Sequence, residues 1–324
     1  MADLSDWAFP PEMQPNPEET RFDLEIALDS LVLLRAEVPE DAFTAGILGT
    51  DRIGNGVVIR DDGLILTIGY LITEATTIWL STNHGTVIGG FPLAYDQATG
   101  FGLVQPLGRL DVPALARGTA SECRVGDDVV VAGQGGRKHA LKTKIIAKRE
   151  FAGYWEYVLD EAVFTAPAHP HWSGTALIGG NGRLLGIGSL LVQEELGGRT
   201  VQGNMIVPID PLEPILGDLV NLGRANRPAR PWLGLYTTEV QGHVVVSGLA
   251  SGGPAERAGV RAGDIVIEVS GERVGGLADL FRKIWRLGSA GVEVPLTLVR
   301  EGAVSRVSAE SVDRQELLRK PLLH

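Results

Sequence analysis

Residues 169–189 read His-Pro-His-Trp-Ser-Gly-Thr-Ala-Leu-Ile-Gly-Gly-Asn-Gly-Arg-Leu-Leu-Gly-Ile-Gly-Ser, and the signals that decide the fold meet in this stretch. The pattern predicts a loop that ends around Ser173, followed by a β-hairpin whose strands cover Thr175–Ile178 and Leu184–Ser189, with a tight turn at Gly180–Gly182. A serine therefore stands at the mouth of the hairpin. Most loop serines form local hydrogen bonds or contact solvent, so this stretch alone does not indicate a nucleophile.

Length and composition bound the class of protein. With 324 residues the chain is too long for one ordinary domain, which favours two. Hydrophobic residues make up 44% of it, and 42 glycines with 18 prolines indicate many turns and hence β structure. The formal net charge of -11 disfavours a nucleic-acid partner, because phosphate binding needs a basic face. The single cysteine, Cys123, cannot form a disulfide within the chain.

The start of the sequence bears on location. Acidic residues and prolines stand where a secretory signal would need basic residues followed by an apolar run. The longest early apolar stretch, Leu31–Leu34, is far too short to span a bilayer. We therefore expect no membrane span and a cytoplasmic location, with a periplasmic location as the alternative if this methionine is not the natural start.

Five parts follow from composition and patterning. Residues 1–21 are polar and proline-rich and predict an N-terminal arm. Residues 22–223 contain many short strands with few helices between them, which is typical of an all-β barrel or a pair of barrels. The run of arginine and proline at 224–231 predicts a linker. Residues 232–312 predict a mixed α+β domain, and residues 313–324 form a tail.

The expected elements can be stated by residue number. In the first domain a short helix precedes strands near 32–38, 54–60, 64–70, 77–81, 86–94, 102–105, 128–132, 141–147, 161–167 and 201–207, and a helix over 211–222 closes the domain. In the second domain we expect strands over 242–248, 264–269 and 292–300 and helices over 253–258 and 277–287.

Two motifs in the first domain resemble the HtrA/DegP family of trypsin-like serine proteases. Gly54-Asn-Gly-Val-Val and Asp62-Gly-Leu-Ile-Leu-Thr are similar to the family's hairpin that leads to its general-base histidine, but here Tyr70 occupies the position of the base. Further along, the family has an aspartate that orients the histidine, and Gly100 takes that position. The resemblance thus keeps the frame of the site while two of its three catalytic positions differ.

The nucleophile loop resembles that of the same family. His171-Trp172-Ser173-Gly174 keeps the serine but replaces the glycine two residues before it, whose N–H helps to form the oxyanion hole. The resemblance covers about residues 22–312. It implies a mostly β fold, a trypsin-like double β-barrel followed by an α+β PDZ domain, in which Tyr70, Gly100 and Ser173 meet at the barrel interface.

The chemistry that follows from these replacements is weak. A serine hydroxyl becomes a good nucleophile only when an oriented base takes its proton, and tyrosine, whose usual pKa is near 10, is protonated at neutral pH. We therefore interpret the domain as a protease fold with a degenerate triad. His84, His139, His169 and His171 are alternative bases, but none has a carboxylate at a suitable spacing.

Cofactor and metal sites have little support. His169 and His171 share a face of an extended chain, but two imidazoles without a third ligand make a weak case for zinc, so we expect no metal. Neither a phosphate-binding loop nor a dinucleotide-binding glycine motif occurs, so we expect no cofactor.

The second domain resembles the family's PDZ domain. Gly253-Pro-Ala-Glu-Arg-Ala-Gly-Val and the Gly263-Asp264 pair match its motif closely, and Trp232-Leu233-Gly234-Leu235 resembles the loop whose amides bind a peptide's terminal carboxylate. Such a domain binds an extended peptide as an added strand. The alternative is a groove filled by the chain itself, for which the tail over 315–324 is a candidate.

Three functions remain open. The first is a proteolytically inactive HtrA homologue that binds peptides or scaffolds proteins in quality control through its PDZ domain, with protein C-termini as partners. The second is a weak or unusual serine endopeptidase that uses Ser173, and the third is a chaperone-like assembly. The resemblance also implies a homo-oligomer, by analogy a trimer.

Overall fold

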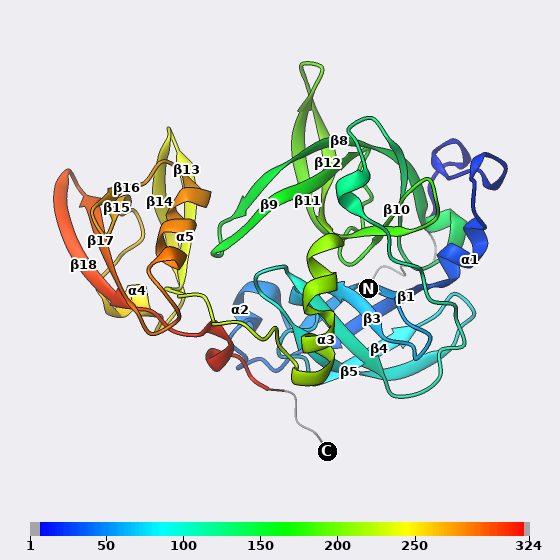
Figure 1. Ribbon diagram of the computed structural model, residues 1–324, viewed down its shortest axis with the longest axis horizontal. Helices are drawn as coiled ribbons and strands as arrows, with labels where there is room; N and C mark the ends of the chain where they lie inside the picture. The colour runs from blue at the N-terminus through cyan, green and yellow to red at the C-terminus, as the bar shows by residue number, and fades with distance from the viewer. Residues whose placement is uncertain (1–6, 321–324) are drawn as a thin grey trace. The chain divides into compact units, whose positions relative to one another are not determined.

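Residues 31–106 close into a six-stranded antiparallel barrel in the computed structural model, which describes residues 7–320 (Figure 1). Its strands follow one another around the barrel in the order β1-β2-β3-β6-β5-β4. Their bounds are β1 Leu31–Glu37, β2 Asp51–Val58, β3 Ile65–Ile68, β4 Thr77–Ser81, β5 Val87–Tyr95 and β6 Phe101–Pro106. β1 is paired on both sides, so Leu34 faces Gly54 in β2 and Leu80 in β4. The prediction of a β-barrel is confirmed.

A second six-stranded barrel follows, in the order β10-β11-β12-β9-β8-β7. Its strands are β7 Asp128–Ala132, β8 Ala140–Gly153, β9 Tyr157–Ala166, β10 Ala176–Ile178, β11 Leu184–Leu196 and β12 Arg199–Pro208. β8, β9, β11 and β12 have 10 to 14 residues each. β8 and β9 extend beyond the predicted stretches 141–147 and 161–167, so the hairpin that they form is longer than the sequence indicates.

Helices in both barrels are short. α1 Leu24–Asp29 is capped by Asp23, whose Oδ1 accepts a hydrogen bond from the N–H of Ile26. α3 Glu213–Leu222 ends at Gly223, which has a φ of 70° and donates its N–H to the Leu219 carbonyl, as predicted for that helix. The remaining short elements are α2 Ala45–Leu48 and the 3-10 turns η1 Pro11–Met13, η2 Pro17–Glu19, η3 Gly69–Leu71, η4 Ala120–Glu122, η5 Gly136–His139 and η6 Asp210–Leu212.

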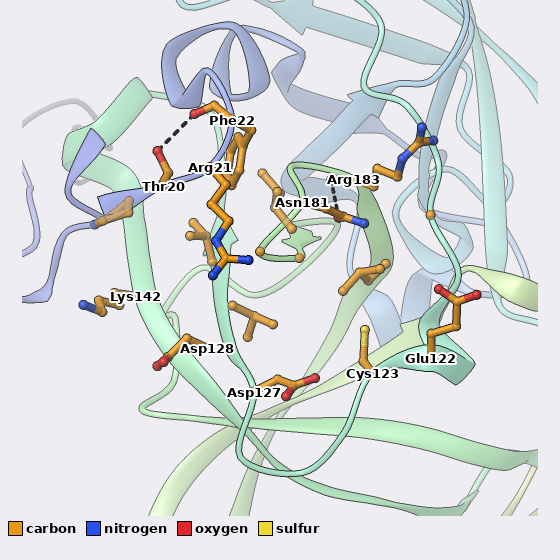
Figure 2. A pocket seen from close by; sticks show the side chains of 18 of the residues that line it. Thr20, Arg21, Phe22, Glu122, Cys123, Asp127, Asp128, Lys142, Asn181 and Arg183 are labelled. Carbon is orange, nitrogen blue, oxygen red and sulfur yellow. Dashed lines mark hydrogen bonds between the residues drawn. The ribbon is translucent and has the colours of Figure 1, made fainter. Parts of the chain in front are cut away.

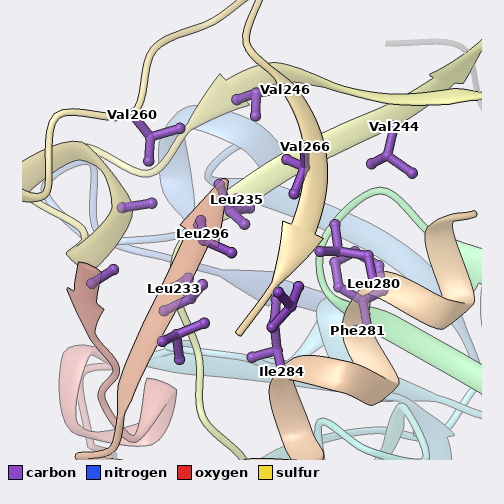
Figure 3. Close-up of a cluster of buried hydrophobic side chains, with 14 of the residues drawn as sticks. Leu233, Leu235, Val244, Val246, Val260, Val266, Leu280, Phe281, Ile284 and Leu296 are labelled. Carbon is purple, nitrogen blue, oxygen red and sulfur yellow. The ribbon is translucent and has the colours of Figure 1, made fainter. Parts of the chain in front are cut away.

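The C-terminal part forms a sheet in the order β13-β14-β15-β17-β18, with β16 paired to β15. The elements are β13 Leu235–Val240, β14 His243–Leu249, α4 Pro254–Arg257, β15 Ile265–Val269, β16 Glu272–Arg273, α5 Leu277–Arg286, β17 Glu293–Arg300, β18 Ala303–Glu310 and η7 Arg314–Leu317. α5 presents Leu280, Phe281 and Ile284 to Leu235 and its neighbours (Figure 3), and all four side chains are fully buried. This is the α+β domain expected from the sequence.

Contacts along the chain define two compact units, and they are not contiguous in sequence. The first contains both barrels, in Met1–Arg149, Glu161–Asn226 and Arg319–His324. The second contains Arg227–Leu318 together with Glu150–Asp160, the tip of the β8–β9 hairpin. The boundaries predicted from the sequence, 22–223 for the barrels and 232–312 for the PDZ domain, do not separate this tip from the barrel residues.

Candidate functional site

Tyr70 and Ser173 form a hydrogen-bonded pair. The Tyr70 Oη lies 2.8 Å from the Ser173 Oγ and 2.7 Å from the carbonyl oxygen of Ser189. A phenol has one proton and the Ser189 carbonyl can only accept, so with that proton committed the Ser173 hydroxyl is the donor in its contact with Tyr70. The serine thus has a partner at the position where a protease has its base.

The Tyr70 phenol is a poor proton acceptor. Burial raises its pKa well above the usual range, more than its hydrogen bonds with Ser173 and Trp172 lower it. The ring is therefore neutral at neutral pH. The hydrogen bond with Tyr70 fixes the position of the Ser173 hydroxyl.

Two buried charged residues that the sequence did not single out hold the turn that carries Tyr70. Arg52 is 4% exposed and donates through Nη1 to the carbonyls of Tyr70 and Thr73, at 2.8 and 2.9 Å, and through Nη2 to the Thr44 Oγ1 at 2.8 Å. Burial lowers the pKa of Arg52 to about 10, so the guanidinium stays charged at neutral pH. These bonds explain why the chain forms η3 at residues 69–71 where the sequence predicts a continuing strand.

Glu74 is the acidic member of this network. Its carboxylate accepts hydrogen bonds from the N–H groups of Phe43, Thr44 and Arg319, at 3.1, 2.7 and 3.0 Å. Burial raises the pKa of Glu74, but its hydrogen bonds together lower the pKa by more, so the pKa lies below the usual value. No motif in the sequence marks Arg52 or Glu74, because most of their partners are backbone groups that any residue could supply and the one side-chain partner, Thr44, is distant in sequence from Glu74.

The backbone of Gly100 is hydrogen-bonded to the turn that carries Tyr70. Its carbonyl accepts a hydrogen bond from the Gly69 N–H at 2.7 Å, and its own N–H donates to the Asp96 carbonyl at 2.8 Å. The φ of Gly100 is 83°, a conformation that glycine adopts without strain. The position is thus next to Tyr70 but brings no carboxylate to it.

The N–H of His171 is already committed. It donates to the His169 Nδ1 at 3.1 Å, while the His169 Nε2 lies 3.0 Å from the His139 carbonyl. Asn204 holds His169 from both sides, since its Oδ1 accepts from the His169 N–H at 2.7 Å and its Nδ2 donates to the His169 carbonyl at 3.1 Å. The amide that would serve an oxyanion hole is therefore paired with a side chain of the loop itself.

His169 should make stability depend on pH. Burial lowers its pKa to about 4, from an ordinary value of 6.5. In the unfolded chain His169 is protonated below about pH 6.5, whereas in the folded chain it is protonated only below about pH 4. The free energy of unfolding therefore falls as the pH drops from about 6.5 to 4, and His169 contributes about 3 kcal/mol to this loss. Urea unfolding at pH 7.5 and 4.5 measures the loss, which should shrink in His169→Gln. An equal loss in both proteins would contradict the assignment.

The glycine after Ser173 is required by close backbone approach. Gly174 has a φ of 74°, and a Cβ on it would lie 1.9 Å from the Asn55 carbonyl oxygen. Asn55 in turn binds the loop, because its N–H and Nδ2 donate to the Ser173 carbonyl at 2.8 and 3.2 Å. The loop is thus held against β2 with no room for a side chain.

Replacing that glycine should be costly. Gly174→Ala is expected to lower the free energy of unfolding by about 2–4 kcal/mol, because strain and overpacking add. Gly180→Ala is the matched control, since a Cβ there has nothing within 4 Å, and it should change stability by less than about 0.5 kcal/mol. Chemical denaturation measures both, and a similar loss in the two variants would contradict the prediction.

A cavity of about 540 Å³ opens beside Ser173 and is lined in part by Trp7, Lys138, His139 and Trp172. His139 does not act on the serine, because its ring nitrogens lie 2.8 Å from the carbonyls of Gln134 and Trp7. His84 pairs with Asp29 at 3.1 Å. None of the four histidines considered as alternative bases, all within the described residues 7–320, forms a hydrogen bond with the Ser173 hydroxyl, whose side-chain partner is Tyr70.

A larger cavity of about 930 Å³ lies elsewhere on the first unit (Figure 2). Side chains of both charges line it, including Arg21, Arg183, Asp127 and Lys142, and among the described residues its lining includes neither member of the Tyr70 pair. Across residues 7–320, no group of three or more His, Cys, Asp or Glu side chains could hold a metal ion. No helix in this part of the chain is long and apolar enough to cross a bilayer.

The loop over Trp232–Leu235 forms an anion-binding site. The N–H groups of Leu233, Gly234 and Leu235 converge on the Glu156 carboxylate, with distances to Oε1 of 3.1, 2.7 and 2.9 Å. The Trp232 N–H is directed elsewhere and donates to the Val312 carbonyl at 3.1 Å. Three of the four predicted residues therefore supply amides to the site, and a carboxylate of the chain itself occupies it.

Comparison with known proteins defines the class of this chain. Residues 54–187 match the trypsin-like peptidase domain and residues 231–310 match the PDZ domain. The fold and this domain order make the chain a trypsin-like peptidase homologue with a C-terminal PDZ domain. It is similar to HtrA-type proteases, which the relatives described next represent.

The relatives are distant in sequence. A probable periplasmic serine endoprotease of the DegP type from Halomonas elongata is 26% identical over 263 residues, covering 77% of this chain and 54% of the relative. The periplasmic endoprotease DegQ of Escherichia coli is 26% identical over 267 residues, with coverages of 78% and 57%. The serine protease Do-like HtrA of Bacillus subtilis is 23% identical, with coverages of 77% and 61%. The chain spans little more than half the length of these curated relatives.

Solved structures share the fold. The HtrA-type protease AlgW with a tripeptide superposes with a TM-score of 0.54 at 18% identity and covers 95% of this chain and 99% of its own. A serine endoprotease from Yersinia pestis has a TM-score of 0.53 at 19% identity, with coverages of 91% and 99%. At this identity the likeness supports the fold.

The predicted cytoplasmic location is wrong. The Halomonas and Escherichia relatives are periplasmic endoproteases, which points to the periplasm. The sequence argument failed because it relied on the composition of the first residues, and that composition says little about a protein whose relatives are exported.

Proposed function

We propose that this chain is an HtrA-type protein that does not hydrolyse peptides through Ser173 and that acts by binding the C-termini of peptides or proteins through its PDZ domain. The observation that carries the proposal is the Tyr70 phenol bonded to the Ser173 hydroxyl. The relatives' periplasmic location carries over to the proposal.

The missing base supports inactivity. Hydrolysis requires the Ser173 proton to move to an acceptor as the oxygen attacks, and a buried neutral phenol has no appreciable affinity for a second proton. Removing the base of a serine protease lowers kcat by on the order of a millionfold. The absence of a carboxylate at Gly100 would leave even a histidine at residue 70 without its orienting partner.

The state of the loop supports the same proposal. A tetrahedral intermediate needs backbone N–H donors at the developing oxyanion, and losing one donor lowers kcat by about 10²–10³-fold. The N–H of His171 donates to the His169 Nδ1 at 3.1 Å. The site would have to break this bond before the amide could stabilise an oxyanion.

The binding half of the proposal rests on the loop over residues 232–235. Its three converging amides favour a carboxylate. Beside it, β13 offers a strand edge and α5 offers apolar side chains, the two further features that capture an extended peptide. A free carboxylate followed upstream by apolar residues is the ligand class that this chemistry fits.

A fluorophosphonate probe tests the catalytic half. Because it labels only activated serines, intact mass measurement should detect no adduct on the wild-type chain, while an active trypsin-like protease gains one under the same conditions. Casein hydrolysis should be equal in the wild-type protein and in Ser173→Ala. An adduct that disappears in Ser173→Ala would overturn the proposal.

The rival function is a weak serine endopeptidase. The cavity of about 540 Å³ beside Ser173 favours it, and the relatives are named as endoproteases. The probe distinguishes the two functions without requiring the natural substrate. A homo-oligomer, by family analogy a trimer, is part of our proposal, and sedimentation equilibrium would measure it.

A further inference from the structure

The tip of the β8–β9 hairpin, residues 150–160, packs with the PDZ domain. Glu156, near the middle of the tip, is 3% exposed. The Glu156 Oε1 accepts three backbone hydrogen bonds from residues 233–235, and its Oε2 accepts a fourth from Leu233 at 3.2 Å. The side-chain carboxylate therefore fills the loop that would bind a terminal carboxylate.

The backbone of the tip also pairs with β13. The Thr237 N–H donates to the Tyr154 carbonyl at 3.1 Å. Moving two residues back along the tip, from Glu156 to Tyr154, corresponds to moving two residues forward along β13, from Leu235 to Thr237, which is the relation between antiparallel strands. The Tyr154 ring packs edge-on against Tyr236 at 6.1 Å between ring centres. The tip thus imitates an added peptide strand.

An apolar side chain of the tip completes the imitation. Val158 is 7% exposed and belongs to the same buried cluster as Leu233, Leu235, Phe281 and Ile284. A peptide ligand would place its own apolar side chain against the groove between β13 and α5. Val158 lies in the core of the PDZ domain, and Ala152 of the tip packs against the same cluster.

Helix α5 holds both ends of the tip. Arg282 forms ion pairs with Glu150 at 2.5 Å and with Asp160 at 2.6 Å. All three side chains are substantially exposed, so these pairs contribute little stability. Because these ion pairs lie at the two ends of the tip, they orient the tip on the PDZ domain but add little to its binding free energy.

Docking of the tip also has costs. Glu156 has a φ of 60°, which is strained for a residue other than glycine. Burial raises the pKa of Glu156 to about 7. The hydrogen bonds from Leu235, Leu233 and Gly234 and the charge of Arg314 lower the pKa, but by less than burial raises it. These costs offset part of what the four hydrogen bonds contribute and so lower the free energy that a competing carboxylate must overcome.

We propose that residues 150–160 are an intramolecular ligand of the PDZ domain, with the Glu156 carboxylate in the place of a peptide's C-terminal carboxylate, so that a peptide binds only by displacing the tip. This inference rests on the proposed function of the same loop. It adds a regulated state in which the binding site is closed by the chain itself.

The test is a titration of the full-length protein with fluorescein-labelled octapeptides that end in Val or Leu, each with a free carboxylate and as the amide. Glu156→Gln keeps the shape of the side chain and removes its charge. Glu156→Gly removes the side chain together with its hydrogen bonds and relieves the strain of the turn, because glycine adopts a positive φ freely. Glu301→Gln and Glu301→Gly are matched controls, because Glu301 is an exposed glutamate of the same domain with a φ of 50°.

We expect free-carboxylate peptides to bind Glu156→Gly at least about tenfold more tightly than the wild-type protein, because the Glu156 carboxylate no longer occupies the loop over residues 233–235. Glu156→Gln should lie between them, and both Glu301 variants should match the wild-type protein. Hydrogen exchange at the amides of residues 233–235 should be slow in the wild-type protein and faster in Glu156→Gly.

The alternative outcomes are distinct. Equal peptide affinity in the wild-type protein and Glu156→Gly, with amides excluded by both, would overturn the intramolecular ligand and leave the proposed peptide binding intact. Unchanged hydrogen exchange at residues 233–235 would also overturn it. Failure of every peptide to bind either protein would overturn both proposals, since no competition could then exist.

Discussion

A triple variant, Tyr70→His with Gly100→Asp and His171→Gly, is expected to hydrolyse casein on the order of a thousandfold or more faster than the wild-type protein. The first change supplies a base where the phenol now contacts Ser173, and the second supplies its orienting carboxylate. The third gives the loop a glycine, whose backbone can turn its N–H away from the His169 ring and toward an oxyanion. Initial rates with labelled casein measure the gain.

The double variant without the change at His171 is the informative control. It should remain about 10²–10³-fold slower than the triple variant, because one oxyanion donor is still bonded to His169. Ser173→Ala in the triple background should abolish the activity. Equal rates for the double and triple variants would mean that His171 does not limit the site.

The second large effect concerns stability. Arg52→Met is expected to lower the free energy of unfolding by about 3–5 kcal/mol, because it removes a buried positive charge that attracts Glu74 and leaves four hydrogen-bond acceptors without the donor that Arg52 now supplies. Chemical denaturation followed by circular dichroism measures the change. Methionine fills most of the volume of the arginine stem, so the loss reports on charge and hydrogen bonding.

The matched control is Arg35→Met, on the strand next to that of Arg52. Arg35 pairs with Asp51 at 2.8 Å, but the two side chains are 40% and 46% exposed. Its replacement should cost less than about 1 kcal/mol, the range of exposed ion pairs. A loss in Arg52→Met no larger than in Arg35→Met would contradict the role of the buried network in holding the Tyr70 turn.

Much of the fold was predictable because short strands leave a strong local signal. β4 and β7 begin and end at the residues that alternation indicated, Thr77–Ser81 and Asp128–Ala132. β8 runs to Gly153 and β9 begins at Tyr157, well beyond the predicted ends. Apolar and polar residues alternate along a strand that buries one face, and this pattern is lost where the β8–β9 hairpin extends beyond its barrel and packs on other residues.

The site was predictable only in part, because its partners are distant in sequence. Motifs flanking residues 70 and 173 indicated that they meet, and the Tyr70 and Ser173 oxygens lie 2.8 Å apart. Nothing local shows that the His171 amide turns to His169, since that choice depends on a rotamer. Glu156 lies in an aromatic turn with no motif, and its contacts are 77 to 79 residues away. The sequence left open a groove filled by the chain itself and offered the tail over 315–324, of which residues 321–324 lie outside the described part; the loop holds the Glu156 carboxylate of the β8–β9 tip.

The discontinuous second unit has a consequence for connectivity. The chain enters this unit at residues 150–160, returns to the barrels, and enters it again at residue 227. A single cut in the stretch 224–231 would therefore break the covalent link between the barrels and the PDZ domain. The hairpin tip would stay attached to β8 and β9 and would still be bound to the severed PDZ domain. Such a nick would produce a two-chain complex held by non-covalent contacts, and gel filtration would show one peak where denaturing electrophoresis shows two bands.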